Sequence, residues 1–131
     1  MSSTPLQIVQ TAYQAFATRD ATKLLGLFSP EIEIVQSTEV PWGGAFRGHA
    51  GAQQFFGTLT KHINSTLEIE RWLNSGDHVV AIGWTAGTVN ATGAKYRVPI
   101  AHVWKVQDGL VTRIHFLIDN PTMLTALAAG K

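Results

Sequence analysis

A histidine stands alone among apolar residues in the run from Tyr96 to Val106. If this run is a strand, its side chains alternate between two faces, and one face carries Tyr96, Val98, Ile100, His102, Trp104 and Val106. This face is apolar enough to be buried, and His102 is its only group that titrates near neutral pH. Such an imidazole could act as a general acid or base, because its unperturbed pKa lies near the pH at which most enzymes work.

Two further polar side chains could face the same interior. Gln36 shares one face of an expected strand with Ile32 and Ile34, and Tyr13 lies on the apolar side of the first helix. A buried polar group needs a partner from protein, water or ligand, so His102 and Gln36 are candidate pocket residues. Each has a structural alternative: a core histidine satisfied by the protein, a glutamine bonded to backbone, and a tyrosine hydroxyl in solvent.

Large apolar side chains on the expected strands and helices could line a pocket around these polar groups. We expect one cavity with few charges, lined by Ile34, Trp42, Phe55, Trp84, Tyr96, Trp104, Phe116 and Ile118. Aromatic residues also dominate small cores, so ordinary packing is the alternative for these side chains. Asp119 could add a carboxylate to the pocket, although its position directly before a helix favours an N-cap.

The composition excludes several classes of site. The chain has no cysteine, its five histidines show no pair spacing typical of zinc sites, and no Gly-rich phosphate loop or Gly-x-Ser-x-Gly motif occurs. We therefore expect neither a metal nor a cofactor. The net charge is +1 without a run of Lys or Arg, so nucleic acid is not an expected partner. No apolar stretch is long enough for a membrane span and no signal peptide is recognised, so the expected location is cytoplasmic.

The elements that position these residues follow from periodicity and turn residues. Helices are predicted after Thr4-Pro5, after Asp20, around Phe55 and after Asp119. Strands are predicted at 32–37, 66–73, 79–89, 94–106 and 110–118, with a loop at 41–48. The order helix, helix, strand, helix, four strands, helix predicts one α+β domain over residues 1–131, with a curved sheet wrapped on the helices.

Short motifs occur in a characteristic order along nearly the whole chain. They are Ala15–Asp20, Leu24–Glu31, Pro41–Gly44, Phe46–His49, Phe55-Phe56, Ala101–Gly109 and Arg113–Asp119. In order and spacing they resemble the ketosteroid-isomerase and SnoaL-like polyketide-cyclase families of the nuclear-transport-factor-2-like superfamily. The resemblance implies a cone-shaped, mixed, mostly antiparallel sheet, a pocket between helices and sheet, and often a dimer.

The catalytic residues of these families transfer poorly to this chain. The resemblance puts Gln36 at the position of the proton-moving aspartate of ketosteroid isomerase and His102 at that of its protonated aspartate. Tyr13 lies one residue from the position of its tyrosine, and the aspartate of the cyclases falls on Phe116. An amide cannot take a proton from a carbon acid near neutral pH, so steroid isomerisation by that route is not expected.

Two functions remain open. One is a protein that binds or orients a small apolar carbonyl or hydroxyl compound, and the alternative is an isomerase, cyclase or lyase with His102 as general acid or base. In either case we expect a homodimer that forms through the sheet. The faces of the later strands opposite the pocket mix Ala101, Val103 and Leu117 with polar residues, which suits such an interface.

Overall fold

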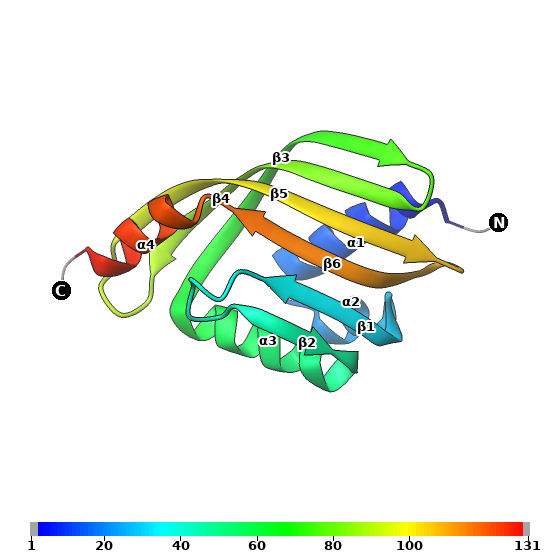
Figure 1. The fold of residues 1–131 in the computed structure, drawn as a ribbon, viewed down its shortest axis with the longest axis horizontal. Coiled ribbons are helices and arrows are strands. Elements are labelled where there is room, and N and C mark those ends of the chain that lie inside the picture. The colour runs from blue at the N-terminus through cyan, green and yellow to red at the C-terminus, as the bar shows by residue number, and fades with distance from the viewer. Residues whose placement is uncertain (1–2, 130–131) are drawn as a thin grey trace.

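The computed structural model describes residues 3–129, which form one curved sheet with helices on its concave side and at one end (Figure 1). The helices are α1 (Pro5–Ala17), α2 (Ala21–Gly26), α3 (Gly48–His62) and α4 (Asn120–Ala128). The strands are β1 (Phe28–Gln36), β2 (Gly44–Arg47), β3 (Ile63–Ser75), β4 (His78–Val89), β5 (Lys95–Gln107) and β6 (Leu110–Ile118). The predicted α+β class is confirmed, with one strand more than expected.

Side-chain caps set the starts of the first two helices. Thr4 accepts a hydrogen bond from the backbone N–H of Gln7, whose side chain accepts one from the backbone N–H of Thr4, and Pro5 follows as the first helical residue. Asp20 accepts from the backbone N–H of Lys23 at the start of α2. Both predicted helix starts are therefore confirmed.

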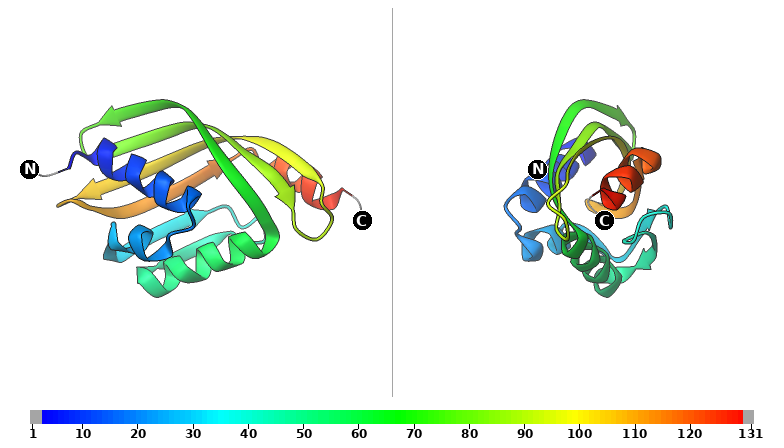
Figure 2. Two further views of the ribbon diagram at one scale, coloured as in Figure 1. Left: turned by 180° about the vertical axis from the view of Figure 1, so that it is seen from behind. Right: turned by 90° about the vertical axis from the view of Figure 1, so that its left-hand side faces the viewer.

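The strands are ordered β2-β1-β6-β5-β4-β3, and every neighbouring pair is antiparallel except β1 and β6, which are parallel. The long strands bend together, so that the sheet curls around α1 and α3 and leaves one end at which α4 lies (Figure 2). This arrangement confirms the predicted cone of mixed, mostly antiparallel strands around the N-terminal helices.

One strand was missed and another begins earlier than predicted. Residues 44–47, expected in a loop, form β2, which pairs with β1 and packs Phe46 against Phe55 of α3. β1 begins at Phe28 despite the proline that follows. The pairing with β6 is interrupted between Phe28 and Glu33, so Pro30, which has no N–H, removes no regular hydrogen bond from the sheet.

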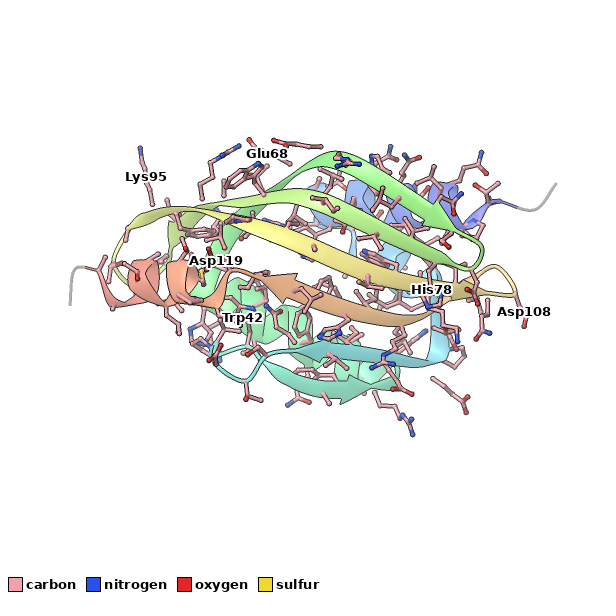
Figure 3. All side chains as sticks on the ribbon, turned by 45° about the horizontal axis from the view of Figure 1, so that its top comes forward. Trp42, Glu68, His78, Lys95, Asp108 and Asp119 are labelled. Atoms are coloured by element: carbon pink, nitrogen blue, oxygen red, sulfur yellow. The ribbon has the colours of Figure 1, made fainter. Side chains whose placement is uncertain are left out.

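Apolar side chains face the inside of the cone and charged ones face solvent. The predicted inner face of β5, which contains His102, is buried at every position from Tyr96 to Val106. Charged side chains such as those of Glu68, Lys95 and Asp108 extend away from the sheet (Figure 3). No helix within residues 3–129 is long and apolar enough to cross a membrane.

Candidate functional site

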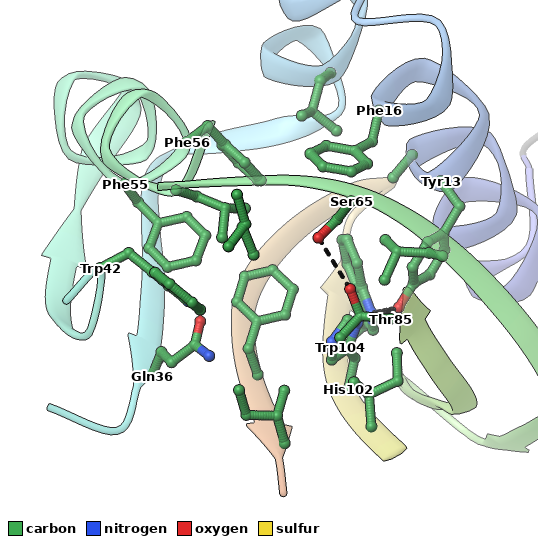
Figure 4. A pocket seen from close by; sticks show the side chains of 18 of the residues that line it. Tyr13, Phe16, Gln36, Trp42, Phe55, Phe56, Ser65, Thr85, His102 and Trp104 are labelled. Atoms are coloured by element: carbon green, nitrogen blue, oxygen red, sulfur yellow. Dashed lines mark hydrogen bonds between the residues drawn. The ribbon is translucent and has the colours of Figure 1, made fainter. Parts of the chain in front are cut away.

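A cavity lies inside the cone, between the concave face of the sheet and the helices (Figure 4). Its volume is about 70 Å³, which is room for about five water molecules or one small organic molecule. Its walls are mostly aromatic and aliphatic, and none of the lining residues is Asp, Glu, Lys or Arg. A cavity with such walls suits an uncharged, mostly apolar guest.

Three side chains on one side of the cavity form a hydrogen-bonded chain. The indole N–H of Trp104 donates to the hydroxyl oxygen of Tyr13 at 3.0 Å, and that hydroxyl lies 2.7 Å from Nδ1 of His102. An indole N–H can only donate, so the Tyr13 oxygen accepts from Trp104 and its own proton remains for Nδ1. Nδ1 is then the acceptor, and the neutral ring of His102 carries its proton on Nε2.

Burial keeps these groups uncharged. It lowers the pKa of His102 from 6.5 to about 3, because the imidazolium would lose its hydration without gaining a charged partner. The ring instead contacts Phe116 edge-on, with 4.6 Å between ring centroids. Burial also raises the pKa of Tyr13, an effect that its hydrogen bond with Trp104 partly opposes. At neutral pH the site therefore acts through hydrogen bonds between uncharged groups.

Gln36 borders the cavity from the side opposite His102 (Figure 4). Both residues are in register with Phe116, Gln36 from β1 and His102 from β5, so the Phe116 ring lies between them. Two strand spacings, about 10 Å, separate their Cα atoms. Each residue is only 5% exposed. Yet neither the Gln36 amide nor Nε2 of His102 has a hydrogen-bond partner among residues 3–129, and both remain accessible from the cavity.

A second polar cluster, which the sequence did not reveal, consists of three hydroxyl groups. Thr85 Oγ1 donates to Ser65 Oγ at 3.1 Å, and Ser65 Oγ is hydrogen-bonded to the hydroxyl of Tyr96. Ser65 and Thr85 line the cavity, and Tyr96 lies behind them. Burial raises the pKa of Tyr96, and the hydrogen bond with Ser65, the nearby Thr85 hydroxyl and the charge of Arg19 partly oppose this. The cluster therefore also consists of neutral groups at physiological pH.

The structure brings most of the candidate residues to one cavity. The polar ones there are Tyr13, Gln36 and His102. The apolar ones are Trp42, Phe55, Trp104, Phe116 and Ile118.

Trp84 was predicted in the cavity, and the structure places it on the convex face of the sheet. Its indole donates to Glu70 Oε1 at 2.9 Å, and the guanidinium of Arg97 lies 3.8 Å from a ring centroid. The prediction was wrong because both faces of β4 carry apolar residues. Alternation along β4 puts Thr85 inward and its neighbour Trp84 outward.

Three other candidates also lie off the cavity wall. The side chain of Asp119 accepts from the backbone N–H of Thr122, so it caps α4 instead of facing a ligand. Ile34 is fully buried in the core, and Tyr96 reaches the cavity only through Ser65. The sequence can indicate that the ring of a tyrosine at such a strand position is buried, but it does not indicate where the hydroxyl group lies.

The chemistry available is that of neutral donors and acceptors. Residues 3–129 contain no group of three or more histidine, aspartate or glutamate side chains that could hold a metal ion. The cavity can hold an apolar body and can fix oxygen atoms of a guest by hydrogen bonds from His102 Nε2 and Gln36. The hydrogen bonds from Trp104 to Tyr13 and from Tyr13 to His102 orient the His102 ring for this contact.

Comparison with known proteins places this cavity in a known fold. Residues 9–114 match the model of a family described as the SnoaL-like domain. No curated protein sequence matches the chain at a significant level. Among solved structures, an NTF2-like protein from Burkholderia thailandensis is 26% identical, with 95% of this chain and 98% of that chain covered and a TM-score of 0.88.

Two more distant structures share the fold. TerC, co-crystallised with polyporic acid, is 23% identical, with 97% of this chain and 100% of that chain covered and a TM-score of 0.88. A candidate polyketide cyclase from Pseudomonas putida is 17% identical, with 97% and 100% covered and a TM-score of 0.84.

Proposed function

The chain belongs to the SnoaL-like domain family, and from this membership and the cavity we propose that it binds a small, mostly apolar molecule through a carbonyl or hydroxyl oxygen. His102 holds the oxygen, Gln36 offers a second polar contact across the Phe116 ring, and the aromatic walls enclose the apolar body. TerC, a structural relative, was co-crystallised with polyporic acid. That complex supports the proposal that the cone of this chain is also a ligand site.

The observation that carries the proposal is a pair of unpartnered polar groups at an apolar cavity. Nearly all buried polar atoms in proteins have a hydrogen-bond partner, and one left without a partner costs about 1–3 kcal/mol. Within residues 3–129, neither Nε2–H of His102 nor the amide of Gln36 has a hydrogen-bond partner, and the two groups lie on either side of the Phe116 ring. A ligand ring lying on Phe116, with an oxygen near His102 and a second polar atom near Gln36, supplies these partners.

The test is the variant His102→Phe, which keeps the ring volume and removes the donor. We expect a small ketone such as acetophenone, titrated by NMR, to bind the unmodified protein and to bind the variant about tenfold or more weakly, a loss of about 1.4 kcal/mol. The control is His78→Phe, which changes an exposed histidine next to the turn between β3 and β4. Equal affinities for the unmodified protein and His102→Phe, with the fold intact, would exclude a ligand-binding role for His102.

Catalysis is a second candidate, favoured by the hydrogen bond from Tyr13 to His102 Nδ1. A ligand proton can move to Nε2 only in the other tautomer of His102, in which Nδ1–H donates to the Tyr13 oxygen and so holds the ring in place. This function ranks second because the pKa of His102 is lowered to about 3, which makes the ring a weak base. Exchange of the methyl protons of acetophenone in D₂O, faster with the protein than with His102→Phe, would support it. No difference in exchange rate would exclude it for this ketone.

We also propose that two chains pair through the convex face of the sheet. Apolar side chains lie in register across four strands there: Leu73 with Val80, Val80 with Val103, and Ala101 with Leu117. Leu73 and Leu117 are 43% and 44% exposed. Pairing would cover this patch.

A further inference from the structure

We propose that Ser65 is a second ligand-binding group, which donates a hydrogen bond to an oxygen of the ligand other than the one held by His102. This inference rests on the proposed function and adds Ser65 to the polar groups that contact the ligand. It makes the ligand a compact apolar molecule with two hydrogen-bond-accepting oxygens.

The distribution of buried polar residues first points to Ser65. Tyrosine and tryptophan apart, the buried polar residues among residues 3–129 are Gln36, Ser65, Thr85 and His102. All of them line the same cavity. A core built for packing alone would avoid polar groups or spread them over the interior. Their collection on one cavity wall is typical of a site in which a few polar groups fix the orientation of an apolar ligand.

The backbone is shaped so that the hydroxyl cluster can form. Gly87 of β4 is in register with Ser65 of β3 on one side and Tyr96 of β5 on the other. A Cβ atom at Gly87 would lie 3.1 Å from the Tyr96 hydroxyl and 1.9 Å from the carbonyl oxygen of Asn64. The missing side chain therefore leaves the space through which the Tyr96 hydroxyl reaches Ser65 across the middle strand.

A count of protons shows that the cluster has one donor to spare. The Thr85 hydroxyl also lies near that of Tyr96, but outside hydrogen-bond geometry, so the cluster holds two hydrogen bonds. Three hydroxyls carry three protons, and these two hydrogen bonds use two of them. Thr85 donates one of these bonds to Ser65. The remaining question is whether Tyr96 donates to Ser65 or Ser65 donates to Tyr96.

Acidity and location together assign the spare proton to Ser65. A phenol is a stronger acid than an alcohol and hence the better donor, so Tyr96 donates to the Ser65 oxygen. Ser65 then accepts from both neighbours, and its own proton has no partner among residues 3–129. Ser65 is also the member of this pair that lines the cavity. Its free proton is therefore available to a ligand oxygen.

The two donors define the class of ligand. Nε2–H of His102 and the hydroxyl of Ser65 both require an acceptor, and the walls between them are apolar. A carbonyl at one end and an ether or second carbonyl at the other satisfies both groups. A ligand with a single oxygen leaves Ser65 unpaired.

The test compares acetophenone with its 2-, 3- and 4-methoxy isomers, which place a second acceptor at three different distances from the carbonyl. We expect at least one isomer to bind the unmodified protein about three- to tenfold tighter than acetophenone, as befits one added hydrogen bond. In Ser65→Ala that preference should disappear while the affinity for acetophenone is kept. If no isomer gains affinity, or if Ser65→Ala keeps the gain, the inference is overturned.

A second variant keeps the test decisive if Ser65→Ala does not fold. Tyr96→Phe retains Ser65 and its proton, so the preference for the methoxy isomer should persist. A preference that appears only in Tyr96→Phe would mean that Ser65 donates to Tyr96 in the unmodified protein, and would overturn the inference. Failure of the proposed function is a different result: acetophenone then does not bind, or binds equally well to His102→Phe.

Discussion

Because His102 is buried in an apolar environment, its protonation should affect the stability of the protein. The unfolded chain binds a proton at this residue below about pH 6.5, whereas the folded chain does so only near pH 3. The free energy of unfolding should therefore fall as the pH drops from about 6.5 toward 3, by up to about 1.4 kcal/mol per pH unit from this group. Urea unfolding of His102→Phe at several pH values should show a shallower decline. Parallel curves for the two proteins would contradict this account.

Tyr13 connects His102 to Trp104 by hydrogen bonds, so the effects of Tyr13→Phe and His102→Phe on stability should be coupled. Tyr13→Phe leaves Nδ1 of His102 and the indole N–H of Trp104 without a partner, at a cost of about 1–3 kcal/mol in unfolding free energy. In the His102→Phe background one of these orphaned atoms is absent, so the same change should cost less. A double-mutant cycle by urea unfolding measures the difference, and we expect about 1 kcal/mol of coupling. Additive effects would mean that the hydrogen bond contributes nothing.

Which site residues the sequence could reveal depends on how different the two faces of each strand are. On β5 one face is apolar and the other carries Lys95, Arg97 and Lys105, so the inward position of His102 could be predicted. On β4 both faces carry apolar residues, so alternation could not choose between Trp84 and Thr85. The large aromatic side chain made Trp84 the predicted cavity residue, but its side chain points outward.

At the scale of elements, local signals predicted the helix starts and failed where distant backbone contacts decide. Gly43 and Gly44 favour a loop in sequence. In the structure, a Cβ at Gly43 would stand 1.8 Å from the carbonyl oxygen of Ser37, so this glycine allows the chain to turn back tightly on β1. β2 can pair with β1 because the chain turns back at this glycine. Similarly, Ser65 fell outside the predicted strand because β3 begins directly after α3, without a turn signal.

The helices also suggest how a ligand enters. A cleft of about 420 Å³ opens between α3 and the α1–α2 pair, and it shares Phe16, Leu24 and Phe56 with the inner cavity. These side chains form the wall between the two spaces. The chain lacks cysteine, so Ala12→Cys places a single thiol at the inner cavity.

In that background, removal of the wall should speed the reaction of the thiol with iodoacetamide. We expect Phe56→Ala to raise the rate by about tenfold, which corresponds to about 1.4 kcal/mol in the barrier. Leu59→Ala is the control, since Leu59 lines the inner cavity and not the cleft. Equal acceleration by both variants would point to general loosening of the core instead of a route through the cleft.

For the whole molecule, the resemblance over nearly the full length of the chain predicted the cone better than any local pattern. Strand pairing such as that of β1 with β6 joins segments far apart in the sequence, and no periodicity encodes it. The same limit applies to assembly. The apolar character of the outer face of β4, which misled the placement of Trp84, makes physical sense if that face is covered by a second chain.

Pairing through the convex face should depend on the apolar character of its centre. Val103 is half-buried on β5 and is in register with Val80 and His115 on the neighbouring strands, at the middle of the apolar patch. A carboxylate there would lose its hydration on pairing, so Val103→Glu should give a monomer. Light scattering at micromolar concentration should give the unmodified protein twice the mass of one chain. Gln54→Glu, on the exposed side of α3, should leave that mass unchanged. A monomeric unmodified protein would refute pairing through the sheet and leave the exposed leucines without a partner.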